Sequence, residues 1–169
     1  MSSRHDAVTR SYLYQISRRR TALAKRFVWW VKRPLDERKM AEAAALLAGK
    51  HDFRLFCERP AEQPSTLVVV ESAEVAADGA LILIRLAASH FLWKMVRRVV
   101  GTLVQVGAGE LDQKGFEALL AAKAPKSGKG LPAEWTAPPS GLFLERVLYA
   151  GDLPLGPVVP VAPVTDFGF

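Results

Sequence analysis

A β-hairpin followed directly by a helix is the feature that most constrains how this chain can fold. Residues 66–76 and 80–88 have the character of two strands, and Asp78-Gly79 between them suits a tight hairpin turn. From residue 91 to residue 106 the apolar spacing changes to the 3.6-residue period of an amphipathic helix. A hairpin next to a helix predicts a domain in which helices cover a mostly antiparallel sheet.

The remaining elements agree with that class. The sequence predicts strands over 11–17, 27–31 and 141–149, and helices over 113–122 and from an N-cap at Asp36 to a stop at Gly49. We therefore expect an α+β domain over residues 1–150. Beyond it, Pro154, Pro157, Pro160 and Pro163 recur with the period of polyproline II. This spacing predicts an extended, unpacked tail over residues 151–169.

Charge is distributed unevenly along the 169 residues. Residues 1–33 carry nine Lys or Arg against one acidic residue, a balance of +8, whereas the remainder has 14 basic and 16 acidic residues, a balance of −2. Such a concentration favours a surface that binds a polyanion, and the alternative is a solvated basic arm. The single cysteine, Cys57, excludes an intrachain disulfide and a cysteine-based zinc site. No apolar run is long enough to span a membrane, so we expect no membrane partner.

Arg97 is the most informative charged residue of the 91–106 helix. Lys94, Arg98, Gly101 and Gln105 fall within about 40° of one line and predict a polar face. Arg97 lies about 60° from that line, at the border of the apolar stripe. A guanidinium there either pairs with a carboxylate or phosphate or extends to water, and the helical pattern leaves both interpretations open.

Two tyrosines share one face of the first predicted strand, beside a run of arginines. Tyr12 and Tyr14 could stack on unpaired bases or could be half-buried core residues with their hydroxyls at the rim. His51-Asp52 fits a cap better than a catalytic pair, because adjacent helical side chains diverge. The sequence contains no serine-hydrolase motif, phosphate-binding loop or metal-ligand spacing.

Four segments together resemble the tRNA pseudouridine synthase TruA family, over roughly residues 4–150. They are Arg10-Ser11-Tyr12-Leu13-Tyr14 for R-x-Y-x-Y, Gly49-Lys50-His51-Asp52-Phe53 for G-x-H-D-F, Phe91 to Gly101 for F-x-x-x-M-V-R-x-x-V-G, and Gly141-Leu142-Phe143-Leu144 for G-L-x-L. Each motif is weak alone, but their common order makes the resemblance specific. It implies a pseudouridine-synthase-like half-domain.

The resemblance also implies an activity and a site. Members convert uridine to pseudouridine in the anticodon stem-loop of tRNA, without metal or organic cofactor, and a cytoplasmic location is expected. By motif, Tyr12 is similar to the tyrosine that packs against the flipped base, and Arg97 to the arginine that pairs with the catalytic aspartate. Either Leu142 or Leu144 corresponds to the lining of the uridine pocket. The expected RNA contacts are Arg10, Arg18, Arg19, Arg20 and Arg26.

One family motif is absent from the sequence. The catalytic aspartate of the family lies in R-T-D-x-G-V-H-A, and neither Asp6 nor Asp52 matches it. We therefore expect this chain to be inactive alone and to need the N-terminal half of a synthase, and the resemblance further implies a homodimer on tRNA. Two alternatives stay open, a non-catalytic RNA-binding module of the same fold and a domain that binds another protein.

Overall fold

The structure is a computed structural model that describes residues 9–22 and 25–161. Its six strands form one sheet in the order β2-β1-β5-β4-β3, with β6 also paired to β1. The strands are β1 (Thr9–Ser17), β2 (Trp29–Trp30), β3 (Gly49–Asp52), β4 (Leu67–Asp78), β5 (Leu81–Ala88) and β6 (Leu142–Leu148). All the pairings are antiparallel except that of β1 with β2. The expected α+β class is confirmed.

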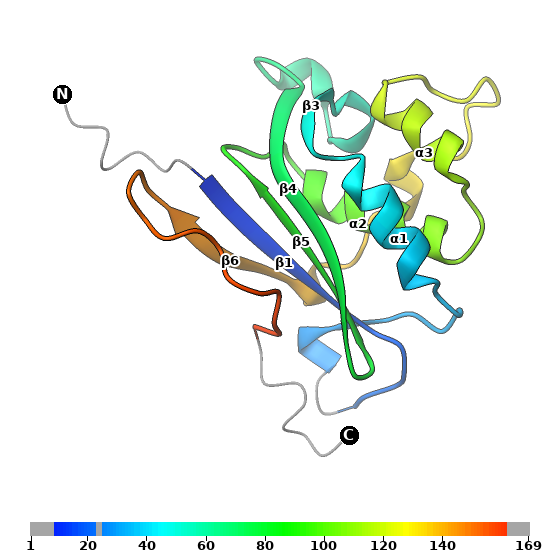
Figure 1. Cartoon of the computed structure of the whole chain (residues 1–169). Helices are drawn as coiled ribbons and strands as arrows, with labels where there is room; N and C mark the ends of the chain where they lie inside the picture. The colour runs from blue at the N-terminus through cyan, green and yellow to red at the C-terminus, as the bar shows by residue number, and fades with distance from the viewer. Residues whose placement is uncertain (1–8, 23–24, 162–169) are drawn as a thin grey trace.

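Three α-helices lie on one side of the sheet (Figure 1). They are α1 (Glu37–Ala45), α2 (Met95–Gly107) and α3 (Gln113–Leu120). Within the described residues no helix is both long and apolar enough to cross a membrane.

The central hairpin forms as predicted. Asp78 ends β4 and Leu81 begins β5, and Gly79 between them adopts a left-handed φ of 60°. Every residue of β5 is buried, and β5 is hydrogen-bonded to β4 on one edge and to β1 on the other. An apolar strand with two paired edges is the central strand that the sequence predicts.

Aspartate side chains cap the N-termini of α1 and α3. The Asp36 carboxylate accepts hydrogen bonds from the backbone N–H groups of Arg38 and Lys39 and so caps α1. The prediction that this helix runs on to Gly49 is wrong, because α1 ends at Ala45 and Gly49, with φ at 103°, begins β3. Asp112 caps α3 in the same way as Asp36 caps α1.

The sheet carries apolar side chains on both faces. Tyr14 and Ile16 of β1 belong to the main core beneath the helices, whereas Leu13 joins a smaller cluster with Val28 and Leu83. This alternation is the one that the β1 sequence predicts.

The prediction that Gly101 lies on a polar face of α2 is wrong, because Gly101 is buried. A short helical segment, η4 (Pro132–Trp135), covers this face, and a Cβ atom built on Gly101 would lie 1.5 Å from the carbonyl oxygen of Trp135. The helix also begins at Met95 rather than at residue 91, because Lys94 adopts a left-handed φ of 62°. The loop between α3 and β6 therefore forms part of the core around α2.

The C-terminal tail packs against the sheet, contrary to the expectation of an unpacked tail. Its described part has no regular helix or strand, but the Arg85 guanidinium donates to the carbonyl oxygens of Gly156 and Pro157. Val158 joins the smaller apolar cluster, and the Val161 N–H donates to the side chain of Gln15. The prediction for residues 162–169 lies outside the described residues.

Candidate functional site

A cavity of about 240 Å³ at the start of α2 collects three of the predicted site residues. Tyr12 comes from β1, Arg97 from α2 and Leu142 from β6, so segments far apart in the sequence meet here. We call it the small cavity. Phe91, Trp93 and Lys94 also line it.

The two tyrosines of β1 have different environments. Tyr14 is fully buried, and its hydroxyl donates to the Pro138 carbonyl at 2.5 Å. Burial raises the pKa of Tyr14, so its phenol stays protonated. Tyr12 is half-buried on the small cavity, and its ring stands edge-on to Phe91 at a centroid distance of 5.0 Å. Tyr14 is thus a core residue, and Tyr12 alone is available to a ligand.

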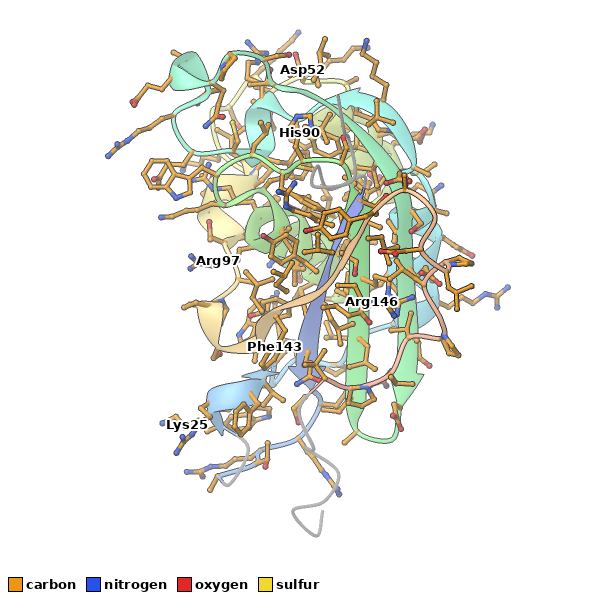
Figure 2. All side chains as sticks on the ribbon, turned by 90° about the vertical axis from the view of Figure 1, so that its left-hand side faces the viewer. Lys25, Asp52, His90, Arg97, Phe143 and Arg146 are labelled. Carbon is orange, nitrogen blue, oxygen red and sulfur yellow. The ribbon has the colours of Figure 1, made fainter. Side chains whose placement is uncertain are left out.

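Arg97 is half-buried, at the border position that the helical pattern predicts. Its Nε donates to the carbonyl oxygen of Ala137 at 2.7 Å, and it lies at the margin of the face seen in Figure 2. No carboxylate among the described residues lies within ion-pair distance of it. The terminal nitrogens of the guanidinium are therefore available to an acceptor from outside the described chain.

The structure distinguishes between the two candidate leucines. In the pairing of β1 with β6, Leu142 lies opposite Tyr14 and Leu144 lies opposite Tyr12, so both point to the helix-covered face. Leu142 lines the small cavity. Leu144 is 53% exposed and is not among the lining residues.

The predicted RNA-contacting arginines are spread over a wider surface. Arg10 donates to the carbonyl oxygen of Ser89, and Arg18 forms an ion pair with Glu37 at 2.6 Å. Arg19, Arg20 and Arg26 are exposed. The small cavity contains none of these five arginines.

A second and larger cavity, of about 820 Å³, lies near the far end of β1 from Tyr12. Arg20 and Arg26 line it together with Lys25, Trp29, Trp30 and Ser140. Lys25 marks this end of the molecule in Figure 2. The basic run in the sequence predicts the arginines as RNA contacts, and the Trp-Trp pair between Arg26 and Lys32 is the signal from which the tryptophans could also be predicted.

The other reactive side chains have structural surroundings. The Asp52 carboxylate accepts from the backbone N–H of Arg54 and the hydroxyl of Thr66, so it is locally satisfied, but it lies in β3 and not on a helix, and it is not a helix cap. Burial raises the pKa of the Cys57 thiol, which keeps it protonated and unreactive. The described residues contain no cluster of three or more side chains suited to holding a metal ion.

Comparison with known proteins connects this geometry to one family. A family model described as tRNA pseudouridine synthase matches residues 43–150, a range that includes Arg97 and Leu142. The protein named tRNA pseudouridine synthase A from Bartonella henselae is 37% identical over 149 residues, which are 87% of this chain. Its namesake from Nitrosococcus oceani is 39% identical over 156 residues, which are 90% of this chain.

The similarity covers only part of those relatives. The matched region is 58% of the length of each of these two proteins. The chain therefore corresponds to little more than half of the proteins that it resembles.

Proposed function

This chain belongs to the tRNA pseudouridine synthase family, and on that premise we propose that it provides one half of a site that isomerises uridine in the anticodon stem-loop of tRNA. The single observation that carries the proposal is the meeting of Tyr12, Arg97 and Leu142 around the small cavity. Each corresponds by motif to a residue of the family's uridine site. The other half of the site, with the nucleophilic aspartate, comes from an N-terminal half.

Tyr12 and Leu142 form the wall for the target base. An uridine turned out of the RNA loop loses its stacking partners, and an aromatic ring together with an apolar side chain replaces them. The edge-on contact with Phe91 restricts the Tyr12 ring to one orientation.

Arg97 holds the incoming aspartate. Its Nε donates a hydrogen bond to the Ala137 carbonyl oxygen, which fixes the plane of the guanidinium and leaves the terminal nitrogens for a carboxylate. An arginine pairs with both oxygens of a carboxylate, and the pairing keeps that carboxylate ionised. An ionised carboxylate is the form that can act as a nucleophile.

The reaction needs no oxidant and no second substrate. The bond between N1 and the ribose C1′ breaks, the base turns, and C5 bonds to C1′, while C5 loses a proton and N1 gains one. The aspartate forms and then releases a covalent bond, so it is regenerated. The C5 proton passes to water, which provides a direct measurement of the reaction.

Reconstitution with an N-terminal half tests the proposal. The chain is mixed with the N-terminal part of a family member that carries R-T-D-x-G-V-H-A, and tritium release is measured from tRNA labelled at C5 of uridine. We expect release only when both parts are present, and none when the added aspartate is changed to asparagine. Release by this chain alone would contradict the missing nucleophile, and no release from the mixture would contradict the split site.

A further inference from the structure

The larger cavity lies outside the site proposed above and has its own chemistry. It forms where the chain leaves β1, passes through η1 (Lys25–Phe27) and returns as β2 beside β1. The side chains that matter below are Arg20, Lys25, Arg26, Trp29, Trp30 and Ser140, and we call the cavity the tryptophan groove. Its volume of about 820 Å³ lies in the range of cavities that hold small organic ligands.

The charge of the groove selects for an anion. Arg20, Lys25 and Arg26 are exposed there, and no acidic side chain is among the described lining residues. The hydroxyl of Ser140 is not free, because it donates to the Val28 carbonyl at 3.0 Å. Recognition of an anion therefore falls to the three cations.

The aromatic side chains select for a flat ligand. Trp30 is 38% exposed, and the Arg20 guanidinium and the Lys32 ammonium lie 5.9 Å and 5.5 Å from its ring centroid. The neighbouring Trp29 is held edge-on against buried Tyr14. Exposed tryptophan beside several cations is suited to a ligand with both a π-face and a negative charge.

The groove and the small cavity lie along the same strand. Trp30 pairs with Ser17, the last residue of β1, and Tyr12 lies five positions earlier in the chain. At about 3.3 Å per residue the two positions are about 16 Å apart. Because side chains alternate along a strand, Trp30, opposite Ser17, points to the other face of the sheet from Tyr12, so an RNA strand that reached both would pass around the β2 edge of the sheet.

From these observations we infer that the tryptophan groove binds an unpaired nucleotide of single-stranded RNA. The base displaces a cation that lies over the Trp30 ring and stacks in its place, and Arg20, Lys25 and Arg26 bind the flanking phosphates. The inference uses the proposed function only to identify that strand as the loop of the substrate tRNA. Binding of single-stranded RNA by the groove is testable without catalysis.

The test measures binding of fluorescein-labelled oligouridylate by fluorescence anisotropy, with a labelled RNA duplex of the same sequence length as comparison. Trp30→Ala is expected to raise the Kd for oligouridylate by about 5- to 100-fold, the usual effect of losing one stacked base. It should leave duplex binding unchanged, because paired bases cannot stack on the ring. Trp30→Phe should retain intermediate affinity.

Two further variants separate stacking from charge and from folding. Lys25→Gln combined with Arg26→Gln should lower the slope of log K against log salt by about 0.7 for each lost phosphate contact. Tyr149→Ala is the matched control, since Tyr149 is also 38% exposed but follows the end of β6, outside the groove. The control should bind as the unchanged chain does, and thermal unfolding shows whether each variant is folded.

The outcomes distinguish this inference from the proposed function. Equal affinity of Trp30→Ala and the unchanged chain for oligouridylate would overturn it, as would no binding of oligouridylate by the unchanged chain. Tight binding of an acidic protein segment in place of RNA would also overturn it. Each of these results would leave the proposed function untouched, because that function is tested by tritium release in the reconstituted mixture. Conversely, an absence of tritium release would not affect the binding of oligouridylate by the groove.

Discussion

Arg97 and Ala137 hydrogen-bond to each other in both directions. The Arg97 side chain donates from Nε to the Ala137 carbonyl at 2.7 Å, and the Ala137 N–H donates to the Arg97 carbonyl at 3.0 Å. This pair joins α2 to the segment that leads into β6, and so fixes one wall of the small cavity relative to another. The orientation of the guanidinium therefore depends on Ala137, which lies forty residues later in the chain.

Arg97→Lys should impair catalysis without unfolding the domain. An ammonium cannot donate to Ala137 and to both oxygens of a carboxylate in one plane, and a charge-assisted hydrogen bond contributes about 1.5–3 kcal/mol. We expect kcat/KM for tritium release in the reconstituted mixture to fall about 10- to 100-fold. Arg38→Lys, at an exposed arginine of α1, is the control. Equal rates for the two variants would remove the assigned role of Arg97.

Gly101→Ala should destabilise the domain, although alanine is the better helix former. At a solvent-exposed position inside a helix, Gly→Ala stabilises the folded state by about 1 kcal/mol. Here the new Cβ would lie 1.5 Å from a backbone oxygen of Trp135, which only a shift of the whole segment can relieve. We expect a loss of about 1–3 kcal/mol in the free energy of unfolding, measured in urea.

Gly156→Ala is the matched control for that change. A Cβ on Gly156 meets no heavy atom within 4 Å, so its effect should stay within about 0.5 kcal/mol. A stabilising effect of Gly101→Ala would show that η4 does not pack on α2 as described.

Local signals in the sequence predicted the elements well. The hairpin at Asp78-Gly79 and the caps at Asp36 and Asp112 depend on neighbours within a few residues, so the chain itself displays them. The motif positions were equally local, and the fold brings Tyr12, Arg97 and Leu142 to one cavity. Their catalytic roles stay predictions.

Contacts between segments that are far apart in the chain could not be predicted from the sequence. A helical projection counts Gly101 as polar, because it contains no information about Trp135 packing on that face. Arg85 lies in an apolar strand, and its partners belong to β4, β6 and the tail. The tryptophan groove likewise exists only because β2 pairs with the end of β1.

Tyr14→Phe should destabilise the domain in a pH-dependent way. The variant leaves the Pro138 carbonyl without its donor, at a cost of about 1–3 kcal/mol near neutral pH. Burial raises the folded-state pKa of Tyr14 above its ordinary value of 10.0, so the native state retains a proton that the unfolded state loses. The stabilisation from Tyr14 is therefore complete below pH 10 and is lost as the pH rises further.

Urea unfolding of both proteins at several pH values checks the direction of this pH dependence. The difference between the unchanged chain and Tyr14→Phe should be constant from about pH 7 to 9 and should shrink above pH 10. Tyr149→Phe, at an exposed tyrosine, should show neither the cost nor the trend. A difference that grows with pH would contradict the burial of the Tyr14 phenol.

Glu145→Gln should be the most destabilising of these changes. Arg85 has only 3% of its side chain exposed, and Glu145 accepts from its Nε and Nη2 at 2.8 Å and 2.7 Å. The bond to Glu145 raises the pKa of Arg85, and because arginine does not deprotonate in proteins, the guanidinium stays charged when Gln replaces this partner. Breaking a buried pair from one side costs about 3–5 kcal/mol.

Glu74→Gln removes a second carboxylate from the same arginine and is the control. Glu74 is 48% exposed and lies 3.3 Å from Arg85, so water already screens this pair and the expected cost is below about 1 kcal/mol. Urea unfolding of both variants measures the two costs on one guanidinium. Equal costs would mean that Glu145 does not compensate the buried charge. A much larger cost for Glu145→Gln would show that this carboxylate allows a charged residue to lie in the central strand, where the Gly156 and Pro157 carbonyls of the tail also reach it.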